Sequence, residues 1–181
     1  FQAAAAMGTP RAGHAAVALP DGRVLVCGGW TGDQATASAE IYDPLTGQWT
    51  GAGEMTVARA SQIVAALPDG RVLVVGGGSG RLGDLATAEV FDPATEAFSA
   101  VGPMHANHYL ATTMADGRVL MTGGQDAEGR ISSSAEIFDP VTGEFQRTGA
   151  MRISRVKHAA VPLADDRVLI LGGSDERGYA G

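Results

Sequence analysis

One nine-residue segment occurs four times along this chain. In each copy, Asp-Gly-Arg or Asp-Asp-Arg leads into a short, mostly apolar run and then into a pair of glycines. The copies occupy residues 21–29, 69–77, 116–124 and 165–173. The first glycines of the pairs, at positions 28, 76, 123 and 172, follow one another by 48, 47 and 49 residues. A period near 50 residues indicates a repeat architecture, in which each repeat is one small unit that packs on its neighbours.

Each repeat begins with a predicted pair of short β strands. The first strands are expected at residues 14–19, 62–67, 109–114 and 158–163, and the second strands at residues 24–27, 72–75, 119–122 and 168–171. Asp-Gly joins them in three copies, which favours a tight hairpin turn with positive φ. Asp165-Asp166 takes that place in the fourth copy, and Asp tolerates left-handed φ better than most residues.

A predicted third strand carries Ala-Glu, an aliphatic residue and an aromatic residue, and it runs into an Asp-Pro turn. Its three copies are residues 39–42, 88–91 and 135–138. A fourth strand follows with one aromatic residue, which is Trp49, Phe98 or Phe145, and Phe1 occupies the same place before the first copy. The first and second strands are almost continuously apolar, which predicts burial on both faces. Four-stranded sheets stacked face to face around an axis meet that requirement.

These motifs resemble kelch repeats. The resemblance rests on the glycine pairs, the Glu-Ile-Tyr/Phe-Asp-Pro segment, the aromatic residue after it and the Met that is followed by an Arg, and it covers essentially the whole chain. Asp-Gly-Arg-Val-Leu together with Asp-Pro-x-Thr-Gly is most similar to bacterial kelch-type sequences. The resemblance implies an all-β kelch-type β-propeller whose blades hold four antiparallel strands, innermost first. It also implies binding through loops at the ends of the central channel, usually without catalysis.

We expect about four blades over residues 1–181, formed by three complete repeats and a partial fourth. The predicted repeats are residues 1–48, 49–97, 98–144 and the incomplete 145–181. The resemblance implies six or seven blades for a whole propeller, so three interpretations stay open. The chain is a segment of a larger propeller, an arc that closes by association with other copies, or a small ring closed by the Phe1 strand.

The composition of the chain limits the classes of partner that we expect it to bind. The net charge of −7 disfavours nucleic acid, because that binding depends on Lys and Arg at phosphates. No apolar run approaches about 18 residues, so no membrane span is expected. The apolar residues 1–7 lack a basic start, so we expect no signal peptide there. Cys27 is the single cysteine, and it leaves the compartment open.

The start of each innermost strand is the predicted binding surface. These positions differ between copies while the strands repeat, as expected where a site is separate from its scaffold. The residues expected to contact a ligand there are His108, Tyr109, Lys157, His158, His14 and Gln62. Hydrogen-bonded structural histidines are the alternative interpretation, and no metal site is predicted.

A second candidate surface lies in the loops between the second and third strands. The residues there that are expected to contribute most to binding a partner are Trp30, Arg81 and Arg130. Three further arginines, Arg11, Arg59 and Arg155, each follow a Met by four residues, and we expect them to bond or stack between neighbouring blades. In the third copy Ala106 takes that place, and the spacing from Met to Asp-Gly is two residues shorter. That blade should therefore have a different entry loop.

The predicted function is a non-catalytic binding scaffold for a protein, peptide or glycan, with no cofactor. The alternative is a part of a galactose-oxidase-like copper oxidase or of a sugar-processing enzyme. His108, followed by an apolar strand and Asp-Gly-Arg-Val, resembles a copper-ligand segment of those oxidases. Asn107 stands where the resemblance requires Tyr, and Cys27 lies in a second strand, so two expected residues are missing. No nucleophile–base pair is indicated by the spacing of the remaining residues.

Overall fold

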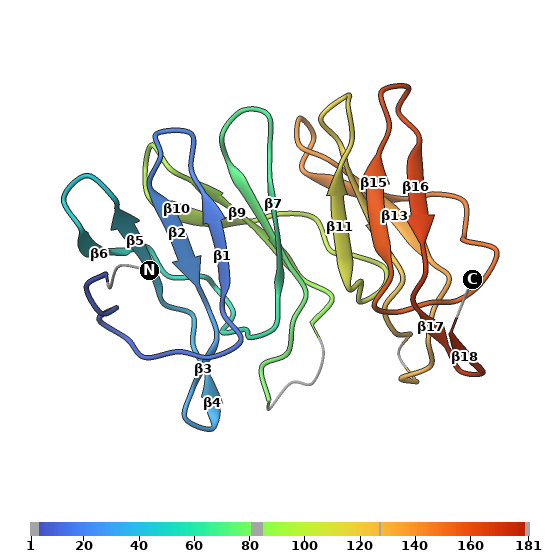
Figure 1. Cartoon of the computed structure of the whole chain (residues 1–181), viewed down its shortest axis with the longest axis horizontal. Helices are drawn as coiled ribbons and strands as arrows, with labels where there is room; N and C mark the ends of the chain where they lie inside the picture. Colours follow the sequence, from blue (N-terminus) through green and yellow to red (C-terminus); the bar gives the residue numbers. More distant parts are fainter. Residues whose placement is uncertain (1–3, 81–84, 127, 180–181) are drawn as a thin grey trace. The chain divides into compact units, whose positions relative to one another are not determined.

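The computed structural model describes residues 4–80, 85–126 and 128–179. Across these residues every regular element is a β strand (Figure 1). No helix in this part of the chain is long and apolar enough to cross a membrane. The chain forms two compact units. The first comprises the residues up to Leu85 together with Glu89–Ala100, and the second comprises Ala86–Ala88 and the residues from Val101 onward.

The first unit contains two four-stranded antiparallel sheets, each of which is one blade. The first blade has the order β1 (Ala15–Ala18), β2 (Val24–Cys27), β5 (Ala39–Asp43), β6 (Gln48–Ala52). The second blade has the order β7 (Ile63–Ala66), β8 (Val72–Val75), β9 (Ala88–Asp92), β10 (Ala97–Ala100). A small hairpin of β3 (Trp30–Thr31) and β4 (Gln34–Ala35) extends the loop after β2.

The second unit repeats this plan. Its complete blade has the order β11 (Leu110–Thr113), β12 (Val119–Thr122), β13 (Ala135–Asp139), β14 (Glu144–Arg147). A two-stranded sheet of β15 (Ala159–Pro162) and β16 (Val168–Leu171) follows, and then a hairpin of β17 (Ser174–Asp175) and β18 (Gly178–Tyr179). Each complete blade takes its outermost strand from the start of the next predicted repeat. The predicted Phe1 strand lies outside the described residues.

The predicted turns are confirmed by the backbone angles. Gly22, Gly70 and Gly117 between first and second strands have φ near 88°, and Asp166 has φ of 60° in the fourth copy. After the third strand, the Asp43 carboxylate accepts a hydrogen bond from the N–H of Leu45 at 2.8 Å. Such Asx turns explain why Asp-Pro ends each third strand.

The predicted burial of the first and second strands is confirmed only in part. All four residues of β8 are buried, as predicted for a second strand. The first strands are buried only in part, since Ala16 and Ala18 of β1 are exposed. In β1 these residues are small alanines, which tolerate an exposed face. The prediction of burial on both faces is wrong for the first strands and also for the second strand β16, where Leu169 and Leu171 are 46% and 48% exposed. In the three complete blades an aromatic pair joins the third and fourth strands, with ring centroids 5.0, 4.8 and 4.9 Å apart (Tyr42–Trp49, Phe91–Phe98 and Phe138–Phe145).

Candidate functional site

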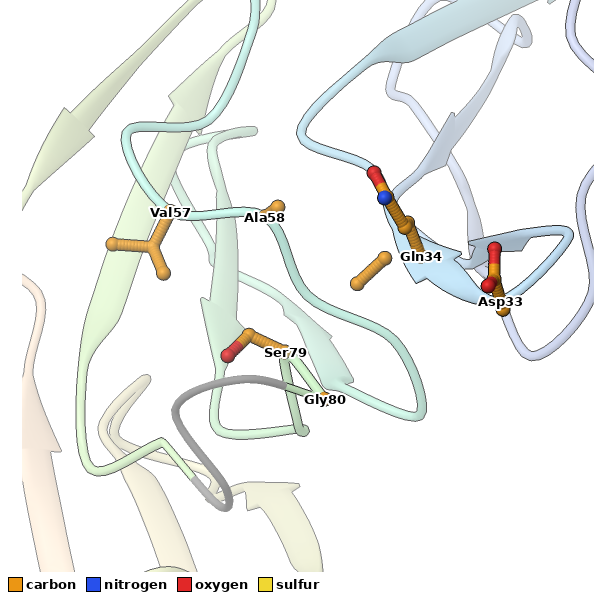
Figure 2. A pocket seen from close by; sticks show the side chains of 7 residues that line it. Asp33, Gln34, Val57, Ala58, Ser79 and Gly80 are labelled. Carbon is orange, nitrogen blue, oxygen red and sulfur yellow. The ribbon is translucent and has the colours of Figure 1, made fainter.

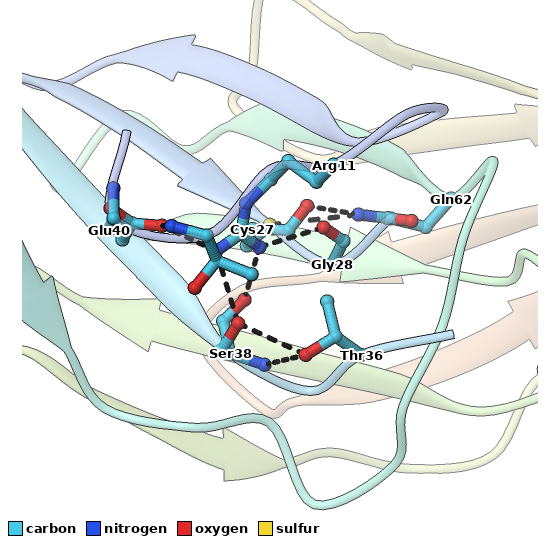
Figure 3. A network of polar contacts seen from close by, with 9 residues as sticks. Arg11, Cys27, Gly28, Thr36, Ser38, Glu40 and Gln62 are labelled. Carbon is cyan, nitrogen blue, oxygen red and sulfur yellow. Dashed lines mark hydrogen bonds and ion pairs between the residues drawn. The ribbon is translucent and has the colours of Figure 1, made fainter. Parts of the chain in front are cut away.

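A buried arginine ties the entry loop of the first blade to the strands of that same blade (Figure 3). Nη1 of Arg11 donates to the carbonyl oxygens of Gly28 at 2.8 Å and Ser38 at 2.9 Å, and its Nη2 reaches Oε1 of Glu40 at 2.7 Å. The Arg11 side chain is fully buried, and that of Glu40 is 9% exposed. Burial raises the pKa of Glu40, but the bonds from Arg11 and from backbone N–H groups outweigh it and hold that pKa below its ordinary value. We call this arrangement the latch.

The second blade repeats the latch with Arg59. Its Nη1 donates to the carbonyl oxygen of Gly76 and its Nη2 to Oε1 of Glu89, both at 2.9 Å. Arg155 bonds the carbonyl oxygen of Gly172 at 2.6 Å in the same way. The guanidinium contacts therefore lie within one blade, which corrects the prediction that they bridge neighbouring blades.

The backbone of the same residue contacts the neighbouring blade. The N–H of Arg59 donates to the carbonyl oxygen of Thr36, and its own carbonyl oxygen accepts from the N–H of Gly29 at 2.9 Å. A Cβ on Gly28 would overlap that carbonyl oxygen. Glycine is required in this position because its φ is 62° and because the next blade approaches its Cα so closely.

The third blade builds its latch from histidine. His108 lies 2.9 Å through Nδ1 from the carbonyl oxygen of Gly123 and 3.0 Å through Nε2 from Oε1 of Glu136. Its side chain is fully buried, whereas His105, which also contacts Glu136, is 45% exposed. The third blade thus has a different entry loop, as its shorter spacing predicts.

Two other predicted ligand contacts bridge neighbouring blades. Nε2 of Gln62 donates to the carbonyl oxygen of Cys27 at 2.6 Å, and Nε2 of His158 lies 2.8 Å from Oγ1 of Thr122. Both side chains are buried. Burial, with the nearby charge of Arg155, lowers the pKa of His158. The Thr122 hydroxyl can therefore donate to a neutral imidazole.

The remaining predicted contacts are accessible. His14 and Lys157 are exposed, and Tyr109 is exposed with its hydroxyl 2.6 Å from Oε1 of Gln125. Arg130 is exposed and paired with Asp126 and Glu128, at 2.8 and 3.0 Å. Arg81 lies outside the described residues.

The two predicted surfaces adjoin each other within each unit. Trp30, from the loop after β2, forms a β-bridge with Ala12, two residues before His14. In the second unit, Tyr109 contacts Gln125 of the corresponding loop. These contacts arise because the loop that enters a blade and the loop that leaves its second strand lie at the same end of the blade (Figure 1).

An open pocket of about 690 Å³ lies among these loops in the first unit (Figure 2). Three short segments line it: Asp33, Gln34 and Ala35 of the β3–β4 hairpin, Val57 and Ala58 of the second entry loop, and Ser79 and Gly80 after β8. Sequence reasoning missed Val57 and Ala58. The available signal was that the residues between the repeated Met and Arg differ in each copy, as Gly-Thr-Pro, Thr-Val-Ala and Arg-Ile-Ser.

The described residues contain no group of three or more His, Cys, Asp or Glu side chains arranged to hold a metal ion. The His105–Glu136–His108 contacts are instead hydrogen bonds to the two carboxylate oxygens.

The family model for the kelch motif matches residues 10–56, 59–105 and 106–152. This chain belongs to the kelch-repeat family. Each match contains one complete four-stranded blade, so the kelch-type β-propeller fold expected from the motifs is confirmed.

One solved structure similar to this kelch chain is that of YjhT, with a TM-score of 0.74 and 16% sequence identity. The match covers 93% of this chain and 60% of that one, so this chain spans about 60% of the length of YjhT. At this identity the likeness shows the fold alone. No curated protein sequence matches the chain.

Proposed function

We propose that this kelch chain is a non-catalytic binding scaffold, and that a short extended segment of a partner protein binds the pocket bounded by the β3–β4 hairpin. The observation that carries the proposal is the division of the first unit into two sets of residues. The latch residues repeat between copies, are buried and are bonded within the protein. The pocket residues lie between them at positions that differ from copy to copy.

The chemistry of the pocket favours a peptide. Val57, Ala58 and Ala35 offer apolar contact, while Asp33, Gln34 and Ser79 supply polar groups beside them. Such a mixture suits a peptide, whose side chains alternate with amide groups. A glycan is less suited, because sugar rings pack on flat aromatic side chains and no described residue in the lining of this pocket is aromatic.

The buried positions of the histidines support the non-catalytic part of the proposal. The Thr122 hydroxyl and the His158 imidazole lie within hydrogen-bonding distance, but both residues are buried, at 2% and 8% exposed. Both ring nitrogens of His108 contact oxygen atoms of the protein, which leaves neither for a copper ion.

The test is selection of peptides from a displayed library on the whole chain, followed by affinity measurements on two variants. Val57→Asp places a charge in the apolar part of the pocket and should weaken the selected peptides by at least about tenfold, or 1.4 kcal/mol. Leu45→Ala is the matched control, because Leu45 is 94% exposed in the turn between β5 and β6. Unchanged affinity for Val57→Asp, with a loss for His14→Ala or Tyr109→Ala, would move the site to the starts of the innermost strands.

A further inference from the structure

We propose that the third blade is closed by a proton-dependent latch, in which a doubly protonated His108 replaces the arginine of the other latches and its deprotonation loosens the entry loop at residues 105–109. The inference concerns a different part of the chain from the proposed peptide pocket.

The side chain of His108 reaches the same two kinds of acceptor as the arginines. Arg59 binds a glycine carbonyl and the carboxylate of the third strand, and His108 binds Gly123 and Glu136 in the same roles. His108 does not stand at the position that Arg59 has in its repeat. Asn107 forms a β-bridge with Gln125 as Ala60 does with Gly78, so Asn107 is the counterpart of Ala60. His108 therefore aligns with Ser61, which has a φ of 56° and whose side chain is exposed.

Two protons are needed on the imidazole of His108. A backbone carbonyl oxygen accepts only, so Nδ1 must carry hydrogen to bond Gly123. Burial opposes ionisation of Glu136, but bonds from His108 and His105 outweigh it and lower its pKa to about 2. The carboxylate is thus ionised and also accepts, so Nε2 must carry a hydrogen as well. A neutral imidazole has only one N–H and leaves one of the two contacts without a donor.

Loss of that proton has a structural cost that the arginine latches do not share. Arginine keeps its charge throughout the accessible pH range, whereas histidine changes charge near neutrality. If a neutral His108 kept its hydrogen on Nδ1, the lone pair of Nε2 would face the buried carboxylate of Glu136. If it kept its hydrogen on Nε2, the hydrogen bond to the carbonyl oxygen of Gly123 would be lost. Unpaired buried polar groups of this kind destabilise the folded state.

The other charged groups around Glu136 do not replace His108. His105 also contacts Glu136, at 2.9 Å, but it is 45% exposed and only its Nδ1 reaches the carboxylate. Arg147 lies opposite Glu136 in the pairing of β13 and β14, but the two side chains form no ion pair. Asp126 forms an ion pair with Arg130.

The fourth strand pair presents two more groups toward the third blade. The pKa of His158 is lowered by burial, with the Arg155 charge as a further cause. The Arg155 guanidinium itself bonds Gly172 of its own strand pair. A pocket of about 290 Å³ borders Glu136 and is also lined by His105 and Arg147.

The first experiment detects the proton directly. The whole chain is labelled with ¹⁵N-histidine, and ring nitrogen shifts are recorded from pH 5.5 to 9, with His108→Gln and His105→Gln used to assign the signals. We expect His108 to show two protonated nitrogens at pH 7, while His158 shows a neutral tautomer. A neutral tautomer for His108 at pH 7 would overturn the proposal, and this measurement needs no variant of the latch to be stable.

The second experiment measures the loosening. Amide hydrogen exchange is compared at pH 6 and pH 9 after correction for intrinsic rates. Protection at residues 105–109 should fall by about tenfold or more relative to residues 55–61, where the Arg59 latch serves as an internal control. The difference should vanish in His108→Gln and persist in His105→Gln. Equal changes in the two segments, or a difference that vanishes only in His105→Gln, would show that His108 is not the proton-dependent group.

Discussion

Removing the arginine of the second latch should destabilise the first unit severely. Arg59→Met keeps an unbranched side chain but leaves the Glu89 carboxylate, only 1% exposed, without its cation. Loss of one partner of a buried ion pair typically costs about 3–5 kcal/mol, because the remaining charge stays desolvated. With a urea m-value of about 1–3 kcal/mol/M, the midpoint of unfolding should fall by at least about 1 M.

Tryptophan fluorescence is the appropriate assay. The chain has two tryptophans, Trp30 and Trp49, and both belong to the first unit, so the signal reports the unit that carries Arg59. Arg71→Ala is the matched control. Its pair with Asp69 is exposed on both sides, at 36% and 47%, and such pairs contribute about 0–1 kcal/mol.

A double variant tests the physical reason. Glu89→Gln removes the negative charge that Arg59→Met leaves unpaired. It keeps an oxygen that can accept from the N–H of Thr56, which bonds Glu89 at 2.7 Å. Arg59→Met with Glu89→Gln should therefore be more stable than Arg59→Met alone. The reasoning is refuted if the double variant is less stable than the single one, or if Arg59→Met shifts the midpoint no more than Arg71→Ala.

Three further outcomes are expected. Gly28→Ala should lower the midpoint of urea unfolding more than Gly22→Ala does. Both glycines have positive φ, but only Gly28 lies against the next blade. Equal midpoints for the two variants would contradict this. Burial raises the pKa of Cys27 to about 11, so a thiol reagent at pH 8 should label it only as the first unit unfolds, and rapid labelling of the folded chain would count against this burial. Folding lowers the pKa of Glu136 from 4.5 to about 2, so its contribution to stability should be complete above pH 4.5 and disappear as the pH falls toward 2. Acid unfolding of Glu136→Gln should show a weaker pH dependence over that range, and an unchanged profile would argue against the shift.

Local sequence determined the strands and turns of this protein. The Asp-Gly turns, the apolar second strands and the Asp-Pro ends of the third strands depend on residues close together in the chain, and a period near 50 residues repeats each signal. The repeated Met-to-Arg spacing also identified Arg11, Arg59 and Arg155 as structural, although their partners were assigned to the wrong blade. Those partners lie 17 to 30 residues away, and only the folded backbone brings them together.

The positions of the pocket and of the latches were decided by tertiary structure. Gln62, His108 and His158 break the repeat, and from sequence they look like residues freed for a ligand. The structure buries all three, because the start of each innermost strand packs against a glycine pair of its own or a neighbouring blade. Variation between copies therefore has two causes that a sequence does not separate. One is a partly exposed loop whose side chains line an open pocket, as at Val57. The other is a side chain at a different position that reaches the same kinds of buried acceptor, as His108 does in place of an arginine.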